Sequence, residues 1–392
     1  ATYGHSVHID VKGLTPDTWY YYRFKHGSEI SPVGRTRTTP ELGASMSRLV
    51  VGQTSCANWQ SGYYQLYSDL AAQQPDYWLA LGDYIYEYGE GEYGEGAALV
   101  RDGENRVPEP THEMVSRQDY VLRHAQYKRD RELQALHARF PMIAVWDDHE
   151  ITNDAWREGA ENHTTATEGD YQLRKQNAIR AYFNWMPLRE QFPRQTGTLL
   201  PDEREVIYRR IRVGDLMDLI MLDTRIVGRD QQAALPTFDV SRFDPNRSLL
   251  GDTQRTWLQL QLLEAKNQGA QWTFLGQQVM FGQLNLLELH DAFSIEELLY
   301  TEAIGICEPG EGAQFLARGD SQIGGRCAVN ASGGLIGMGH PLGPTGIGQI
   351  AEITRQLRGE ATGRQHPNAR WAMAHMIGLG SVSIAHVLST AN

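Results

Sequence analysis

Long apolar runs are absent from this sequence of 392 residues. No stretch of about 18 consecutive apolar residues occurs, so no segment has the composition of a membrane-spanning helix. The first residues also lack the charged and then apolar pattern of a signal peptide, and we expect no targeting segment in this chain. Internal repeats are absent as well. These absences argue against membrane and repeat proteins and favour a soluble, globular one.

Cysteine and positive charge are also scarce. The three cysteines, Cys56, Cys307 and Cys327, are too few and too scattered for a disulfide framework. The 36 Lys and Arg residues are outnumbered by 48 Asp and Glu, so the sequence offers no basic face for nucleic-acid binding. A chain of this length that is 41% hydrophobic can bury a large core and form two or three domains. Cys56 therefore has to be explained by its own surroundings, whereas we interpret the other two as structural.

The sequence pattern changes twice along the chain. Residues 1–40 alternate as antiparallel strands do, and we expect strands at 7–14 and 20–27 and a short one before Pro40. From Ser47 strands alternate with helices, which predicts an α/β fold. We expect strands within 48–56, 76–89, 142–146 and 270–282, a strand pair within 204–225, and helices within 63–74, 116–140, 171–186 and 251–269. After about Leu286 we expect a helix within 288–305, a glycine-rich loop and helix within 329–361, and a terminal strand pair within 371–388.

Potential metal ligands follow three of the expected strands. The first strand ends at Cys56, and the second ends at Asp83 and Tyr86. Ligand sites in α/β proteins lie at the carboxyl ends of strands, where these side chains would meet. Carboxylates at this density repel each other unless a cation binds them. The densest group follows the third strand: Asp147, Asp148, His149, Glu150, Asn153 and Asp154.

Each ligand also has a simpler interpretation. The acidic run could be a solvated loop, Cys56 a small buried hydrophobe, Asp83 a turn residue after glycine, and Tyr86 an ordinary strand aromatic. The agreement of three strand ends favours a metal site. Thiolate and phenolate are typical ligands of Fe³⁺, and carboxylate or amide oxygens suit Ca²⁺ or Mg²⁺. Two such cations could clamp a phosphate and activate a water.

Several long motifs identify a family. GQTSCANWQSGYY, YWLALGDYIYEY, FPMIAVWDDHEITND, DLIMLDTR and QWTFLGQQVMF resemble, in order and spacing, the PhoD-like alkaline phosphatases of the calcineurin-type metallophosphatases, over about residues 10–286. The resemblance implies an α-β-β-α sandwich that follows a few strands of a fibronectin III-like module. It also implies hydrolysis of phosphate esters with Fe³⁺ and Ca²⁺, or with another divalent metal pair, and an extracellular or periplasmic location.

The resemblance also implies roles for single residues. Cys56 and Tyr86 would bind the ferric ion, and Asp83 would bridge the two metals. Asp148 would take the place of a metal-binding asparagine, with Asp147 beside it in the metal site.

The catalytic group implied by the resemblance is His149, Asp148 and Asn153. Asn153 would serve the calcium side or the phosphate, and His149 would lie beside the phosphate oxygens. Asp223 and Arg225 would hold the loops that carry the ligands.

The last third of the chain departs from this family. The family's Gly-Asp-x-His motif, which completes the metal site, is absent, and residues 287–392 resemble the C-terminal part of a sterol-carrier-protein-type thiolase. The motifs are HDAF at 290–293, VNASGGLIGMGHPLGPTG at 329–346 and RQLRGEATGRQ at 355–365. In that family His290 and His340 would help to bind an acyl-CoA thioester. The thiolase nucleophile is absent, and HMIGLG stands at 375–380 where Cys-Gly-Gly is usual.

We therefore expect three parts, 1–40, 41–286 and 287–392, and an α/β fold in which both enzyme-like parts are incomplete. The predicted function is a metal-dependent phosphoesterase that the missing ligands impair. The alternatives are an acyl-CoA-binding module without catalysis, for which the thiolase part would indicate a cytoplasmic location, and a non-functional fusion. The expected partner is a phosphate-ester substrate, and the oligomeric state is left open.

Overall fold

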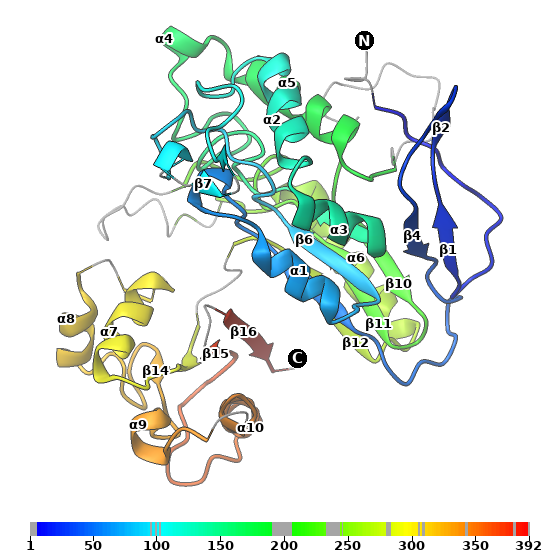
Figure 1. Cartoon of the computed structure of the whole chain (residues 1–392). Helices are drawn as coiled ribbons and strands as arrows, with labels where there is room; N and C mark the ends of the chain where they lie inside the picture. The colour runs from blue at the N-terminus through cyan, green and yellow to red at the C-terminus, as the bar shows by residue number, and fades with distance from the viewer. Residues whose placement is uncertain are drawn as a thin grey trace. The chain divides into compact units, whose positions relative to one another are not determined.

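The structure, a computed structural model, describes most of the chain. The described residues are 6–94, 96–98, 100–101, 103–189, 206–232, 244, 246–279, 284–304, 306–307, 310–341, 344–378 and 382–390. They divide into two compact units, one formed by residues before 280 and one by residues from 280 onward. In Figure 1 the first unit runs from blue to yellow-green and the second from yellow to red.

Small antiparallel sheets begin the first unit. β1 (Trp19–Tyr22) pairs with β4 (Gly34–Arg37), and β2 (Lys25–His26) pairs with β3 (Glu29–Ile30). The strand expected at 7–14 is not formed, which corrects the sequence-based prediction. Val7, Ile9 and Val11 in this segment are exposed. Alternation stabilises a strand only where a neighbouring strand and a covered face exist.

A parallel sheet lies at the centre of the first unit. β5 (Val51–Thr54), β6 (Tyr77–Leu81) and β9 (Met142–Val145) are neighbours in that order, as the buried-type strand composition predicts. α1 (Gln65–Ala72) connects the first two strands. Because all three strands run the same way, the residues after 54, 81 and 145 meet at one edge of the sheet. A further small pair, β7 (Val100–Arg101) and β8 (Glu104–Asn105), lies in the connection to β9.

The single helix expected over 116–140 is two helices. α2 (Arg117–Tyr127) ends four residues before α3 (Arg131–Arg139) begins. The side chain of Asp130 accepts hydrogen bonds from the backbone N–H groups of Glu132 and Leu133, and so starts a new helix. Residues 128–132 are all charged, so the apolar spacing is interrupted at the break, and the prediction of a single helix overlooked this signal.

A second sheet shares the core of the first. β10 (Arg209–Val213) is antiparallel to β11 (Met217–Met221), and β12 (Trp272–Gly276) is parallel to β11 on its other side. Alternate β11 residues such as Leu219 join the core that contains β6 and β9. Ile220 and Leu222 face the other way, onto Leu258 of α6 (Gly251–Asn267). Also in the first unit are α4 (Thr165–Glu168), α5 (Tyr171–Trp185) and the 3-10 turns at Trp59–Ser61 and Gly96–Ala98.

The edge strand β12 leaves apolar side chains uncovered. Trp272 and Phe274 pair in register with Met217 and Leu219, whose side chains lie in the shared core. Nevertheless 62% of Trp272 and 50% of Phe274 are exposed. The described residues therefore cover only part of this sheet's inner face.

The second unit is built on a four-stranded sheet. Its order is β14 (Ala328–Val329), β13 (Leu286–Glu288), β15 (Trp371–Gly378) and β16 (Val382–Ser389). β15 and β16 form the expected antiparallel pair. The central strand β13 was not predicted, because an apolar run this short shows no periodicity that would distinguish a strand from a helix.

Helices cover both faces of this sheet. Phe315 of α8 (Gly312–Ala317) packs in one core cluster with Leu287 and Val329, against which Tyr300 of α7 (Ser294–Ala303) also packs. Ile353 of α10 (Pro344–Arg358) packs in another with Leu286 and Ala372. α9 (Gly334–Met338) follows the turn after β14. Parts of the GHPLG and HMIGLG motifs lie outside the described residues.

Candidate metal centre

Residues from two neighbouring strand ends form a compact cluster of potential ligands. Asp83 follows β6, and Asp148 and His149 follow β9. One ligand atom from each of these three side chains lies within 4.8 Å of the others. Both carboxylates are buried, so their charges have little water to screen them. The sequence predicted that residues from three strand ends would meet, and ligands from two of these ends form this close group.

The backbone around the cluster is unusual. Cys56, Asp83 and Asp154 have φ angles of 58°, 53° and 50°, in the left-handed region that non-glycine residues seldom adopt. Gly82 also has a positive φ, and a Cβ there would lie 2.4 Å from the backbone nitrogen of Asp147. The two ligand-bearing loops therefore touch at a point where only glycine fits. Such local strain is common at functional sites.

Glu150 joins the two loops through hydrogen bonds. Its buried carboxylate accepts from the backbone N–H groups of Asp83 at 3.1 Å, Tyr84 at 2.6 Å and Asp147 at 2.8 Å. Burial, and then the charge of Asp83, raises the pKa of Glu150 above its usual range. Because three donors from two loops converge on one side chain, Glu150 fixes the positions from which the ligands project.

Glu87 orients His149. Its buried carboxylate lies 2.7 Å from Nδ1 of His149 and accepts from the backbone N–H of Asn153 at 2.6 Å. Burial alone would lower the pKa of His149, but the hydrogen bond and charge of Glu87, with Asp83 and Asp148, raise it to about 9. The contact at Nδ1 leaves Nε2 as the ring atom that can face a metal or a phosphate.

Arg225 neutralises the acidic run. Its guanidinium lies 2.5 Å from Asp147, 3.4 Å from Asp148 and 3.1 Å from Asp154. Burial raises the pKa of Asp147 to about 7, although the charge of Arg225 opposes this rise. Asp223 accepts from the backbone N–H of Arg225 at 2.9 Å and thereby fixes the loop that carries it.

Two of the expected metal-site residues lie beside the cluster. Asp147 hydrogen-bonds to Arg225. The side chain of Asn153 donates to Glu161 at 3.0 Å. Neither belongs to the group of close ligand atoms, nor does the exposed Cys56, and the assignment of all three as ligands stays a prediction.

The sulfur and phenol ligands expected next to Asp83 do lie near it. The hydroxyl of Tyr86 donates to Asp83 Oδ2 at 3.0 Å, and its ring stacks on His149 with centroids 4.2 Å apart. Desolvation by the surrounding protein, followed by the charge of Asp83, raises the pKa of the Cys56 thiol to about 11. Asp83 Oδ1 is buried without a hydrogen-bond partner. A buried, unpartnered carboxylate oxygen beside a thiol, a phenol and an imidazole fits a bound cation.

In the second unit, the histidines of the expected acyl-CoA site are neighbours. The rings of His290 and His340 lie 4.9 Å apart and almost at right angles. Nδ1 of His290 lies 3.7 Å from Glu296, and Nδ1 of His340 lies 2.9 Å from Thr345 Oγ1. Their role in binding a thioester stays a prediction. Cys307 and Cys327 are buried and unpaired.

The most informative residue that the sequence interpretation missed is Glu87. It lies in the aromatic stretch after β6, where the sequence shows only a single acid among tyrosines. A charged residue within an otherwise buried-type segment is a signal of a buried pair, but it does not name His149, which is distant in sequence, as the partner. The role of Glu150 was missed for the same reason, because backbone partners leave no sequence pattern.

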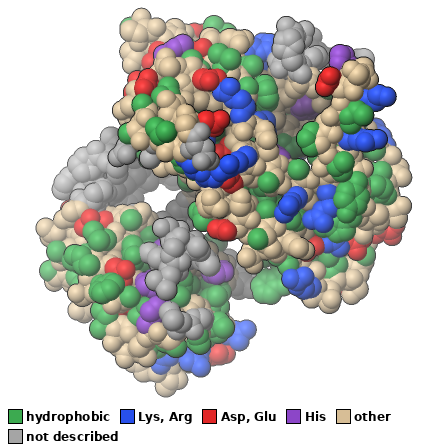
Figure 2. Space-filling model, viewed as in Figure 1, with side chains coloured by type: hydrophobic (Ala, Val, Ile, Leu, Met, Phe, Trp, Pro, Cys, Tyr) green, Lys and Arg blue, Asp and Glu red, His purple; other side chains and the backbone are tan. Residues whose placement is uncertain are grey.

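None of the described helices is long and apolar enough to cross a membrane. On the face drawn in Figure 2, acidic and basic side chains both occur on the surface of the first unit.

The fold and the cluster together define an α/β protein with a candidate metal centre at the carboxyl edge of a parallel sheet. The family model of the PhoD-like phosphatases matches residues 49–303, and that of their N-terminal domain matches residues 1–40. The chain belongs to the PhoD-like phosphatase family. The model of the thiolase C-terminal domain-like family matches residues 257–390. Both resemblances predicted from the motifs are thus confirmed.

Individual relatives match either the phosphatase part or the thiolase-like part of the chain. Alkaline phosphatase D of Bacillus subtilis is 39% identical over 286 residues, which are 72% of this chain and 46% of the relative. Sterol carrier protein 2 of Homo sapiens is 50% identical over 101 residues, which are 26% of this chain and 18% of that protein. A solved structure described as PhoD is 37% identical with a TM-score of 0.60, covering 71% of this chain and 51% of that one. The chain thus spans about half the length of its phosphatase relatives.

Proposed function

We propose that this chain is a metal-dependent phosphoesterase that hydrolyses phosphate monoesters or diesters. The observation that carries the proposal is the cluster of Asp83, Asp148 and His149, whose ligand atoms lie within 4.8 Å of one another in a chain of the PhoD-like family. Carboxylates and an imidazole at the carboxyl edge of a parallel sheet are suited to bind a cation that binds phosphate.

We assign Fe³⁺ and Ca²⁺ as the metals, or another divalent metal pair. Cys56 and Tyr86 supply the soft and phenolic ligands that favour Fe³⁺, and Asp83 lies between them and the second acidic loop. Asp148 and Asn153 would supply oxygen ligands for Ca²⁺. Bound cations would lower the pKa of a water and withdraw charge from the ester oxygens.

Other side chains position His149 and the ligand-bearing loops and neutralise the charge of the acidic residues. Glu87 holds Nδ1 of His149, so that Nε2 can donate a proton or a hydrogen bond to a phosphate oxygen. Arg225 balances the negative charge of Asp147 and Asp148, which reduces repulsion of an anionic substrate. Glu150 fixes the two ligand-bearing loops to each other through backbone hydrogen bonds, and we assign it no contact with the substrate.

We further propose that the domains divide at 1–40, 41–286 and 287–392, with an incomplete α-β-β-α sandwich after a partial fibronectin III-like module. The exposed inner face of β12 supports this incompleteness. Because the Gly-Asp-x-His motif that would complete the metal site is absent from the sequence, turnover should be reduced by at least about 10- to 100-fold. The family similarity favours an extracellular or periplasmic location for the phosphatase part.

Hydrolysis of a chromogenic phosphodiester and monoester, with iron and calcium supplied, tests the proposal. We expect slow, metal-dependent hydrolysis that is lost in Asp83→Asn and kept in Asp69→Asn, an exposed acid on α1. Equal rates with and without Asp83 would overturn the assignment. A rate equal to that of a complete phosphatase of the family would overturn the proposed impairment.

A second candidate function is acyl-CoA binding by the second unit. It is favoured by the adjacent rings of His290 and His340 in a segment that matches the thiolase C-terminal domain-like model. Calorimetry with a CoA ester, with and without chelator, tests it. Binding that needs no metal and weakens in His290→Ala supports this function, and no heat of binding rules it out.

A further inference from the structure

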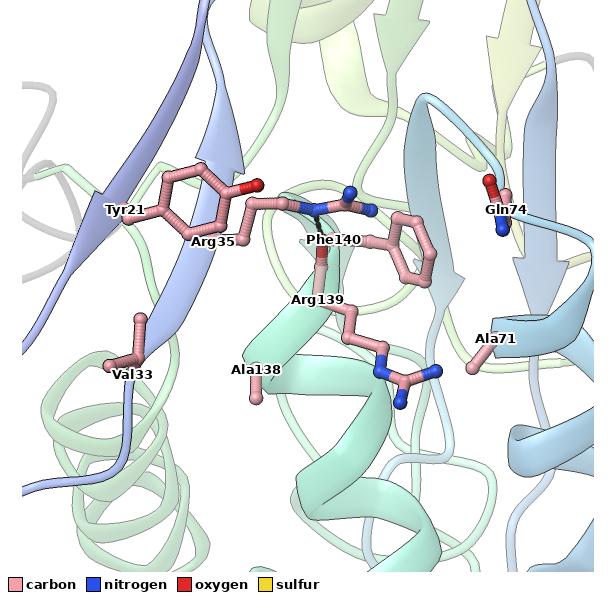
Figure 3. A pocket seen from close by; sticks show the side chains of 8 residues that line it. All are labelled: Tyr21, Val33, Arg35, Ala71, Gln74, Ala138, Arg139 and Phe140. Atoms are coloured by element: carbon pink, nitrogen blue, oxygen red, sulfur yellow. Dashed lines mark hydrogen bonds between the residues drawn. The ribbon is translucent and has the colours of Figure 1, made fainter.

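A cavity of about 350 Å³ opens between the N-terminal strands and the ends of two helices (Figure 3). Tyr21 of β1 and Arg35 of β4 line one side. Gln74, after α1, and Arg139 and Phe140, at the end of α3, line the other. Its volume is within the range of small-molecule sites.

The lining is positively charged in an acidic chain. Arg35 and Arg139 both line the cavity, and none of the residues that line it is acidic. The nearby acids Asp17 and Asp76 are both paired with Arg37 instead. Because the whole chain carries a net charge of −12, two cations without an acid in one cavity are a local exception.

Arg35 is held in place by contacts that leave most of its donors free. Its Nε donates to the backbone carbonyl of Arg139 at 3.1 Å. Its guanidinium carbon lies 4.1 Å from the ring centroid of Trp19 and 5.2 Å from that of Phe140. One carbonyl at the end of α3 uses one of the five N–H donors of Arg35. Among the described residues, no hydrogen bond or ion pair is found for the guanidinium of Arg139, whose backbone carbonyl accepts from Arg35.

The cavity is separate from the candidate metal centre. α1 ends just before β6 and α3 just before β9, so the cavity lies at the amino edge of the parallel sheet. The metal ligands follow the carboxyl ends of the same strands. A strand of five residues, such as β6, separates these edges by about 15 Å.

We propose that this cavity binds a small organic anion that carries a phosphate or carboxylate group and an apolar part. Two guanidinium groups supply the charge and the paired donors that such oxyanions require. Phe140, Tyr21 and Val33 supply apolar surface beside them. The site joins the N-terminal strands to α3, so the bound anion stabilises that junction.

The test uses phenylphosphonate, whose carbon–phosphorus bond a phosphoesterase does not cleave. The full chain is treated with chelator, so that phosphonate at the metal centre does not contribute, and binding is measured by calorimetry. We expect saturable binding that also raises the melting temperature, with affinity reduced about fivefold in Arg139→Gln. Arg180→Gln, an exposed arginine of α5 outside the cavity, should bind as the parent does.

Further ligands identify which anion the cavity prefers, and further variants control for loss of binding through misfolding. Benzoate in place of phenylphosphonate distinguishes a carboxylate site from a phosphate site, and inorganic phosphate shows whether the apolar part is needed. Arg35→Gln, checked for folding by circular dichroism, should also weaken binding. Arg139→Lys keeps the charge and loses the paired donors, so it should bind with intermediate affinity. No saturable binding by the parent, or equal affinity of the parent, Arg139→Gln and Arg35→Gln, would overturn the proposal.

Discussion

Among single residues, Glu87 has the clearest predicted effect, because it touches His149 directly at Nδ1. Replacement by Gln removes the negative charge while keeping the size of the side chain. In chelated protein the pKa of His149 should then fall from about 9 toward its ordinary value of about 6.5. An NMR titration of the imidazole measures this change.

Glu90→Gln is the matched control, since Glu90 is an exposed acid three residues further along the same segment. It should leave the His149 titration unchanged. A His149 pKa that does not move in Glu87→Gln would show that this pair does not set the charge of the imidazole.

Lys128 is a half-buried lysine without a buried acid as its partner among the described residues. Its Nζ donates to the hydroxyl of Tyr84 at 3.1 Å, and burial lowers its pKa to about 7. Between this value and the unfolded value near 10.4, the unfolded chain binds a proton that the folded chain does not. Lys128 therefore contributes to the unfolding free energy of the first unit a part that rises with pH over this window, by at most about 1.4 kcal/mol per unit.

Lys128→Met should remove that part of the slope, which denaturant unfolding at several pH values measures. The contribution of His149 is the same in both proteins and cancels in the difference. Identical slopes for the parent and Lys128→Met would contradict a neutral Lys128 in the folded state.

The sequence could predict contacts between individual residues only where those residues follow neighbouring strands. Asp83, Asp148 and His149 follow neighbouring parallel strands, so their meeting needs only the strand order. The contact of Glu87 with His149 depends on how an irregular loop folds back, and no periodic pattern encodes that path.

Among the elements, α3 has the most specific start. Asp130 caps the helix with one carboxylate oxygen, and its other oxygen lies 2.6 Å from the buried guanidinium of Arg106. Asp130→Ala removes the cap and leaves a buried cation unpaired, and should lower the unfolding free energy by about 3–5 kcal/mol. Denaturant unfolding measures this loss.

Two comparisons separate the cap from the charge. Asp130→Asn keeps an acceptor for the cap and should cost less than Asp130→Ala. Ser116→Ala removes the exposed cap of α2, which has no buried charge partner, and should cost about 1 kcal/mol. Equal losses for Asp130→Ala and Ser116→Ala would contradict the role of the pair with Arg106.

Most elements could be predicted from the sequence because their apolar patterns are local. The strands β5, β6 and β9 are short, apolar and bounded by turn residues, and all three are observed. The exceptions have physical causes. The alternating segment at 7–14 pairs with no strand among the described residues. The break between α2 and α3 falls in a charged run where Asp130 caps the second helix, and β13 is too short to show a period.

At the scale of the whole molecule, the two units have separate cores. Leu219 lies in the core of the first unit and Phe315 in that of the second, and both are fully buried. Calorimetry should therefore show two unfolding transitions. Leu219→Ala should lower one and Phe315→Ala the other, each by about 3–5 kcal/mol of its own unit. A single transition that both substitutions shift together would contradict independent units.

The metal content of the purified full chain tests most directly whether the strand-end cluster is a metal centre. After incubation with iron and calcium and removal of the excess, elemental analysis should find metal bound to the parent and to Asp69→Asn. Asp83→Asn should have lost most of it, because Asp83 is the member of this close group that follows β6, whereas the other two follow β9. Neither iron nor calcium in the parent, or equal metal in the parent and Asp83→Asn, would contradict a metal centre at Asp83, Asp148 and His149.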